Sequence, residues 1–165
     1  MSAKPATIVR HSLKLREGIS ITVAKELENA AKQLVGEIAN AAKSELASND
    51  TERTGLLKAA VSSKAVSYKK RKFNNGKLAI NAAIWGGVGI NKAVQGSFEG
   101  KPVKPTKYAH LVEFGHNAPD GSYVPAKPFM RPAIAKVGSG AEFVRRLESA
   151  FFKGVEAAKT TEVKK

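Results

Sequence analysis

The sequence predicts an α+β fold: a long N-terminal helix and a C-terminal helix packed on a small antiparallel β-sheet, with a projecting basic hairpin or loop. Three patterns predict this class. Apolar residues recur at helical spacing over 20–47 and over 143–155, and they alternate with other residues over 78–90. Spacing by three or four places residues on one face of a helix, and alternation places them on one face of a strand. Helices packed on one face of a sheet satisfy both patterns.

The composition is that of a globular chain. Its 165 residues are 42% hydrophobic and 25% charged, which is sufficient for a hydrophobic core. A usual domain has about 100–200 residues, so we expect one domain over 20–159, an N-terminal arm over 1–19 and a flexible tail over 160–165. The N-terminal residues lack the apolar core of a signal peptide. No apolar run approaches the roughly 20 residues of a membrane span, so we expect no membrane partner.

The first predicted element is a helix over 20–47 whose apolar residues share one face. They are Val23, Leu27, Ala31, Leu34, Ile38, Ala42 and Leu46. Asn49 and Asp50 break this pattern and begin a polar turn. The segment Leu56–Val61 is predicted to be a helical turn that leads into a strand, with Thr54 as its N-cap.

A basic hairpin is predicted next. The alternation over Leu78–Ile90 predicts a half-buried strand, and the glycines near its end indicate a bulge. Asn74–Gly76 is typical of a hairpin turn, so the opposite strand is expected at Val66–Lys69 and its basic extension. The basic cluster Lys69–Lys72 would then lie on a projecting arm.

Two less regular segments follow. The stretch 95–105 is rich in glycine, proline and lysine, which predicts a long, mobile loop. The segment Tyr108–Gly115 is short enough to be a strand or a helical turn. A turn is predicted at Pro119–Gly121.

The C-terminal third is predicted to be extended and then helical. Proline fixes the backbone and fits the first turn of a helix, so Pro125 and Pro128 predict an extended path and Pro132 the start of a helix. Gly138 and Gly140 interrupt that helix.

The last helix is expected to begin at a capping box. Ser139 and Glu142 have the spacing at which each side chain bonds the other residue's backbone N–H. The apolar face that follows has helical spacing. It consists of Phe143, Leu147, Phe151 and Val155.

Positive charge is concentrated in the middle of the chain. The protein has 28 Lys and Arg against 14 Asp and Glu, a net charge of +14. Residues 53–107 hold twelve basic side chains and one acidic one, a net charge of +11. Such a field favours an acidic partner, either nucleic acid or an acidic protein face. A solvated loop kept soluble by its charge is the alternative interpretation.

The sequence offers little chemistry for catalysis. It has no cysteine, which excludes a disulfide scaffold, a thiolate zinc site and a cysteine nucleophile. His110, Glu113 and His116 do not share one face in a strand or in a helix, so we expect no metal there. The glycines of 86–89 lack the Gly-Lys-Ser/Thr ending of a phosphate-binding loop. We therefore expect no cofactor and no enzymatic activity.

Four short boxes, taken in order, carry a resemblance to a known family. Thr54–Lys58 resembles a T-G-x-L-(R/K) box, and Val88–Ile90 resembles a strand-end V-G box. Tyr108–Gly115 resembles Y-A-x-x-V-E-F-G, and Pro125–Ala133 resembles P-A-x-P-F-(L/M)-x-P-A. Together they resemble the neck or tail-completion proteins of tailed bacteriophages, which join head to tail. The motif positions to which the resemblance assigns structural roles are Thr54, Gly55, Tyr108, Glu113, Phe114, Gly115, Pro125, Pro128, Phe129 and Pro132.

The resemblance implies a structural virion protein. It would form a ring of identical subunits, expected to be sixfold, between the head-closure or connector proteins and the tail-tube or tail-terminator proteins. The ring would complete the tail and leave a channel for DNA, and the protein would occupy the host cytoplasm during assembly. Phe114, Phe129 and Met130 are candidate apolar anchors, although domain core is the favoured interpretation of Phe114 and Phe129. An acidic neighbouring ring, or genomic DNA in transit, would meet the basic arm, which comprises Lys69, Lys70, Arg71, Lys72 and Lys77.

Two other functions compete with this one. The net charge suits a small basic nucleic-acid-binding protein, although only Tyr68 and Phe73 flank the basic cluster as aromatic residues. No helix-turn-helix, zinc-finger or RNA-binding signature is present. An enzyme would require a convergent polar pocket that the sequence does not indicate.

Overall fold

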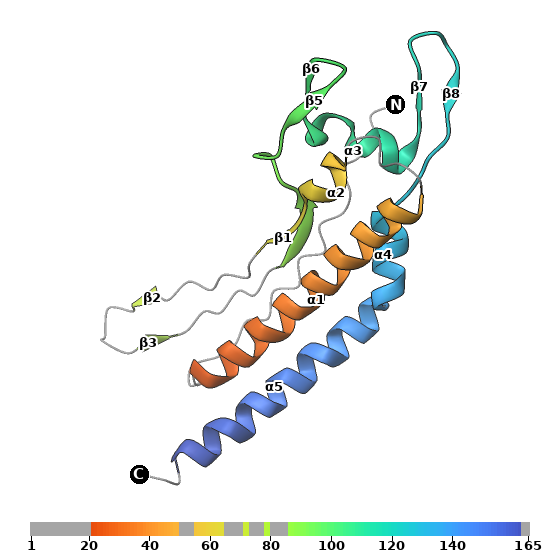
Figure 1. The fold of residues 1–165 in the computed structure, drawn as a ribbon. Coiled ribbons are helices and arrows are strands. Elements are labelled where there is room, and N and C mark those ends of the chain that lie inside the picture. Colours follow the sequence, from red (N-terminus) through yellow and green to blue (C-terminus); the bar gives the residue numbers. More distant parts are fainter. Residues whose placement is uncertain (1–20, 50–54, 65–70, 73–77, 80–85, 163–165) are drawn as a thin grey trace. The chain divides into compact units, whose positions relative to one another are not determined.

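The structure, a computed structural model, describes residues 21–49, 55–64, 71–72, 78–79 and 86–162. Figure 1 shows the predicted α+β class: a long N-terminal helix, a C-terminal helix and small antiparallel sheets. The chain divides into two compact units, which are described separately below. Unit 1 comprises 1–33, 65–87 and 143–165, and unit 2 comprises 34–64 and 88–142. The single domain predicted over 20–159 stays a prediction.

The long helix α1 spans Ile21–Ser48, in agreement with the predicted 20–47. Its apolar face is buried as the spacing predicts. Within unit 1 the buried residues are Val23, Ala24, Leu27 and Ala31. Within unit 2 they are Leu34, Ala39, Ala42 and Leu46.

Unit 1 joins the first part of α1 to helix α5, which spans Gly140–Glu162. Gly154 of α5 lies directly against α1, because a Cβ added there would come within 2.6 Å of the Val23 Cα atom. Lys153 also pairs with Glu26 across the two helices at 3.2 Å. The predicted C-terminal helix is confirmed, and it runs through Glu162, past Thr160, where the flexible tail was expected to begin.

The basic hairpin of unit 1 is confirmed where the structure describes it. Strand β2 (Arg71–Lys72) pairs antiparallel with β3 (Leu78–Ala79), with Arg71 opposite Ala79. The expected turn at 74–76 and the expected strand residues 66–69 lie outside the described residues.

Unit 2 begins with the predicted helical turn and strand. Helix α2 spans Leu56–Ala60 and runs directly into β1 (Val61–Lys64), which pairs with β4 (Gly87–Ile90). The N-cap prediction is wrong, because Gly55 occupies that position without a side-chain bond. Thr54 lies outside the described residues. Of the long strand predicted over 78–90, β3 and β4 are the described parts.

The loop predicted over 95–105 is instead a hairpin followed by the start of a helix. Strand β5 (Gly96–Phe98) pairs antiparallel with β6 (Lys101–Val103). Glu99 and Gly100 form the connection with φ angles of 51° and 75°. Positive φ at both central residues is the geometry that fits the twist of a two-residue hairpin. Pro102 disfavours a central strand, but a two-stranded sheet has open edges that accept it.

The segment Tyr108–Gly115, left open between strand and helical turn, lies in helix α3 (Pro105–Phe114) and its C-cap. Pro105 stands in the first turn, where its missing N–H costs no hydrogen bond. After Gly115, β7 (His116–Asn117) pairs antiparallel with β8 (Tyr123–Val124). The turn predicted at Pro119–Gly121 connects them, and Gly121 N–H donates to the Ala118 carbonyl at 2.9 Å.

Helix α4 spans Met130–Val137 and starts before Pro132, where it was predicted to begin. Gly138 ends it, as predicted. One bond of the predicted capping box of α5 is present, since Glu142 N–H donates to Ser139 Oγ at 3.4 Å. The core of unit 2 gathers buried residues from α1, α2, β1, α3 and α4. Its members are Ala39, Ala42, Leu46, Leu57, Val61, Ala109, Phe129 and Ala133.

Candidate functional site

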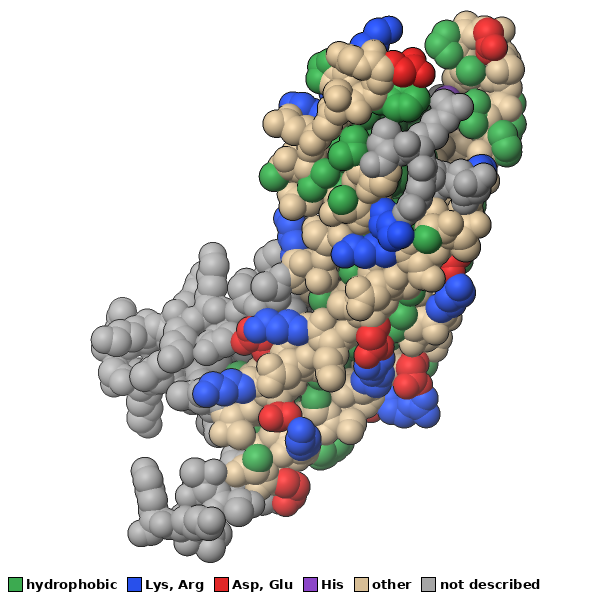
Figure 2. Space-filling view, in the orientation of Figure 1, with side chains coloured by type: hydrophobic (Ala, Val, Ile, Leu, Met, Phe, Trp, Pro, Cys, Tyr) green, Lys and Arg blue, Asp and Glu red, His purple; other side chains and the backbone are tan. Residues whose placement is uncertain are grey.

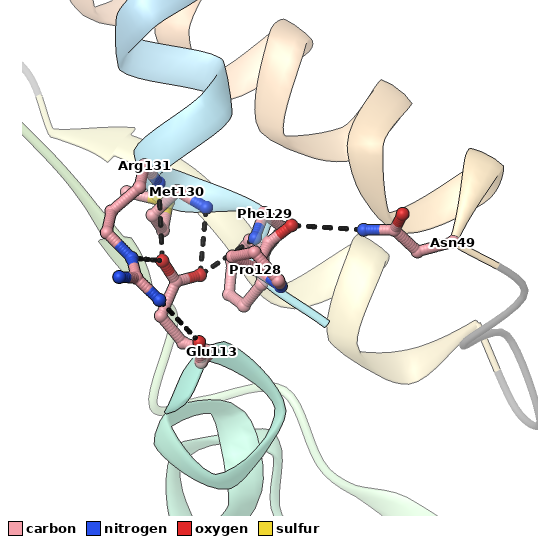
Figure 3. Close-up of polar contacts among 6 residues, drawn as sticks. All are labelled: Asn49, Glu113, Pro128, Phe129, Met130 and Arg131. Atoms are coloured by element: carbon pink, nitrogen blue, oxygen red, sulfur yellow. Dashed lines mark hydrogen bonds and ion pairs between the residues drawn. The ribbon is translucent and has the colours of Figure 1, made fainter. Parts of the chain in front are cut away.

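Glu113 is the centre of a polar arrangement that joins α3 to α4 in unit 2 (Figure 3). It lies on the last turn of α3 with 6% of its surface exposed. One carboxylate oxygen, Oε2, accepts the backbone N–H groups of Phe129 and Met130 at 2.8 and 3.0 Å. The other, Oε1, accepts the backbone N–H of Arg131 at 3.3 Å. A single buried acid therefore binds the N-terminus of α4.

The sequence at the start of α4 explains why this distant cap is needed. The first N–H groups of a helix have no partner within the helix. Phe129 occupies the N-cap position and makes no side-chain cap bond, whereas Ser, Thr, Asp or Asn there would do so. A negative charge at this end is also favoured by the helix dipole. Glu113 supplies both the acceptor atoms and the charge.

Arg131 completes the arrangement from the first turn of α4. Its Nε donates to Glu113 Oε1 at 3.1 Å, and its Nη2 donates to the Glu113 backbone carbonyl at 3.1 Å. Its side chain stays 63% exposed, against 8% for Glu113. The guanidinium group also lies over the Phe114 ring, 5.2 Å from its centroid. Arg131 thus connects the buried acid to an exposed aromatic ring.

Asn49 and Lys127 attach this junction to the end of α1 within unit 2. Asn49 Nδ2 donates to the Pro128 carbonyl at 3.0 Å, and Lys127 Nζ donates to the Asn49 carbonyl at 3.1 Å. Lys127 N–H also donates to the Val112 carbonyl at 2.8 Å. A cation near the last carbonyls of a helix is favoured by the helix dipole. These bonds fix the proline-rich segment against both α1 and α3.

The two candidate aromatic anchors differ. Phe129 is 2% exposed and belongs to the core, as favoured, and Met130 is partly buried against it. Core burial of Phe114 was wrong, because this side chain is 57% exposed. Phe114 is on the solvent side of α3 because the helix turns Glu113, its neighbour, toward α4.

Phe114 belongs to a wider exposed apolar surface. Tyr123 and Val124 of β8 are exposed, as is Ile134 of α4. A Cβ added at Gly115 would lie 2.6 Å from Tyr123 Oη and 2.8 Å from the Val124 carbonyl oxygen, so the hairpin lies directly against the residue after Phe114. Figure 2 shows hydrophobic side chains on the surface where Figure 1 draws β7 and β8.

The remaining described motif positions lie at helix ends, beside the core or on the surface. Gly55 stands in the left-handed region at the start of α2, and Gly115 caps the end of α3 with φ of 72°. Tyr108 is half-buried beside the core. Pro125 is exposed, whereas Pro128 and Pro132 are half-buried.

The basic arm is described in part. Arg71 and Lys72 lie on β2. Lys69, Lys70 and Lys77 lie outside the described residues, so the role of the arm stays a prediction.

The described residues were compared with the ligand sets that bind metal ions. They include no group of three or more His, Asp and Glu side chains that could bind a metal ion. His110 is exposed, and both carboxylate oxygens of Glu113 are occupied by N–H donors. None of the described helices is long and apolar enough to cross a membrane.

Sequence reasoning missed Arg131 and Asn49 as parts of the junction. One signal was available for Arg131: a glutamate between Val112 and Phe114 in an apolar box needs a cationic or N–H partner when buried. Arg131 is one of the two basic residues of the other box, the second being Lys127. Asn49 offered no comparable signal, since a polar residue after a helix is typical of any turn.

Comparisons of the chain with protein-family models, with curated proteins and with solved structures gave no match.

Proposed function

We propose that this chain is a structural virion protein that forms a ring at the head–tail interface of a tailed bacteriophage. The ring completes the tail, joins it to the capsid connector and leaves a channel for DNA. The observation that carries the proposal is the binding of the α4 N-terminus by Glu113. Glu113 belongs to the third motif box and Phe129–Arg131 to the fourth, so the two boxes on which the resemblance mainly depends form one junction.

The chemistry of the junction supports a structural role for Glu113. Both oxygens of the Glu113 carboxylate are held by N–H donors, and the nearest cation is already bonded to it. A general acid or base must exchange its proton with a substrate. The Glu113 carboxylate is instead hydrogen-bonded within the protein. The group that this junction leaves exposed is the Phe114 ring, which lies under the Arg131 guanidinium group.

The basic arm is the proposed contact to a neighbouring ring. Its charge suits an acidic protein face, since tight contact with DNA phosphates would slow the passage of the genome. Reversing Lys69–Lys72 to glutamate should then block the joining of heads to tails. Infectious particles of normal yield from that variant would contradict this assignment.

Electron microscopy of the purified protein tests the proposal. We expect closed rings with a central channel wide enough for duplex DNA, and sixfold symmetry. A field of monomers at every protein concentration tested would contradict ring formation. Open filaments would contradict closure, because a head-to-tail contact closes into a ring only when its rotation permits it.

A nucleic-acid-binding role is the second candidate, and one surface favours it. Lys101, Lys104 and Lys107 are exposed around the start of α3, where the first turn has no acidic residue. Cations at a helix N-terminus oppose the helix dipole, which suggests that this charge serves a partner. Binding to labelled duplex DNA that weakens steeply with salt would support this candidate. The absence of binding at low salt would exclude it.

A further inference from the structure

The large exposed hydrophobic side chains of the described residues fall into two groups. Unit 2 holds Phe114, Tyr123, Val124 and Ile134, which we name the Phe114 patch. Unit 1 holds Val144 and Phe152, both on α5. Exposed aromatic and branched side chains that gather on a surface are typical of protein contacts. Each group is therefore a candidate interface.

The members of the Phe114 patch are connected through Arg131 and Gly115, and Arg131 adds a positive charge. Arg131 lies over the Phe114 ring, and Ile134 follows Arg131 by three residues on α4, so the two share one side of that helix. The Tyr123 hydroxyl lies against the backbone of Gly115, the residue after Phe114. Arg131 is exposed at this surface.

The second group lies along one side of α5 and has one acidic residue at its centre. Val144, Glu148 and Phe152 are exposed and follow one another at intervals of four residues, so they lie along one side of the helix. We name them the α5 stripe. Gly154, which faces α1 within unit 1, lies on the side of α5 opposite this stripe. Glu148 has no hydrogen bond or ion pair with another described residue.

We propose that the Phe114 patch of one copy binds the α5 stripe of the next copy. The apolar side chains of the two surfaces would cover one another, and Arg131 would lie opposite Glu148. This inference rests on the proposed ring, which requires each subunit to present two different surfaces. It names those surfaces and the residues at their centres.

Charge argues against the symmetric alternative. Two Phe114 patches facing each other would bring the Arg131 side chains of both copies together, and like charges across an interface oppose association. Two α5 stripes would bring two Glu148 carboxylates together in the same way. Patch against stripe joins opposite charges.

Two double variants test the pairing. The patch variant carries Phe114→Asp and Ile134→Asp, and the stripe variant carries Val144→Asp and Phe152→Asp. All four side chains are exposed or partly exposed, so folding should persist, and circular dichroism checks this. Matched controls at exposed positions are Asn40→Asp with Thr106→Asp, and Asn29→Asp with Gln33→Asp, which change the charge equally.

Sedimentation velocity measures the oligomeric state of each variant and of their mixture. We expect each variant alone to be monomeric, with self-association weakened at least about tenfold, whereas the controls assemble like the wild type. The mixture should form a one-to-one heterodimer that grows no further, because it contains one intact patch and one intact stripe.

The failures of the two proposals are distinguishable. Oligomers that persist in both double variants would overturn this interface and leave the ring standing. Monomeric variants whose mixture also stays monomeric would overturn the patch-to-stripe pairing. A wild-type chain that is monomeric at all concentrations would overturn both the interface and the ring.

Discussion

Glu113 and Arg131 are joined by two hydrogen bonds that use different parts of the acid. Arg131 Nε donates to the Glu113 carboxylate, and Arg131 Nη2 donates to the Glu113 backbone carbonyl, each at 3.1 Å. The same carboxylate accepts the first backbone N–H groups of α4. The last turn of α3 and the first turn of α4 are therefore held as one piece within unit 2.

Replacing Glu113 by Gln should destabilise the protein by about 2–4 kcal/mol. The amide keeps the shape of the acid but loses the charge and one acceptor, and a buried N–H without an acceptor is costly. Urea unfolding followed by circular dichroism measures this change. Glu99→Gln, at an exposed position, is the control, and we expect it to change the free energy of unfolding by no more than about 0.5 kcal/mol. Equal effects of the two substitutions would contradict the importance of the Glu113 cap.

Gly115→Ala should cost about 2–4 kcal/mol. Gly115 has φ of 72° and ψ of 169°, a combination essentially restricted to glycine. An added Cβ would also collide with Tyr123 Oη, the Val124 carbonyl and Ala126 N, all within 2.9 Å. Gly121→Ala is the control for backbone strain alone, since Gly121 has φ of 84° and open space around it. We expect a smaller loss there, about 1–2 kcal/mol, and thermal unfolding compares the two variants.

Gly154→Ala should destabilise unit 1 even though alanine is the better helix former. The added methyl group would meet the Val23 Cα atom at 2.6 Å, and the two helices must separate to admit it, at about 1–3 kcal/mol. Gly36→Ala, inside α1 with no atom near its added Cβ, should instead stabilise by about 0.5–1 kcal/mol. Hydrogen exchange of the α5 amides measures the first effect locally. Stabilisation by both substitutions would show that the close approach is absent.

The β7–β8 turn should weaken in acid. Hydrogen bonds from the Ser122 hydroxyl and then the Ser122 N–H lower the pKa of Asp120 below its ordinary value. A lowered folded pKa stabilises the turn above the unfolded pKa, about 4, and this contribution is lost as the pH falls through the folded pKa. An NMR titration should show the Ser122 amide moving with Asp120. Asp120→Asn should remove that titration, and an unchanged Ser122 titration in that variant would contradict its assignment to Asp120.

The two long helices could be predicted from the sequence because each depends on spacing along one segment, whereas the segment of α3 was left open between strand and helical turn. The positions of α1, α5 and the β2–β3 pair agree with the predicted patterns. The β5–β6 hairpin could not be predicted, since it depends on positive φ at Glu99, a residue type that rarely adopts it. The early start of α4 was missed for a related reason. Its cap is Glu113, sixteen residues before Phe129, and no local motif records such a partner.

The motif boxes of the candidate site could be recognised in the sequence, but the contacts between their residues could not be predicted. Sequence patterns indicated that Glu113 and Phe129 belong to structural motifs, and they favoured burial of Phe114. Exposure of Phe114 follows from the turning of Glu113 toward α4, which is a tertiary relationship. The exposed Phe114 ring under Arg131 is available for an interface and is not part of the core.

Sedimentation velocity of the wild-type protein, alone and with labelled duplex DNA at low and moderate salt, tests the neck-ring proposal most directly. The proposal predicts one discrete oligomer whose sedimentation coefficient is unchanged by DNA at both salt concentrations. A monomer that moves onto DNA and leaves it steeply as salt rises would contradict the ring and establish the nucleic-acid-binding alternative.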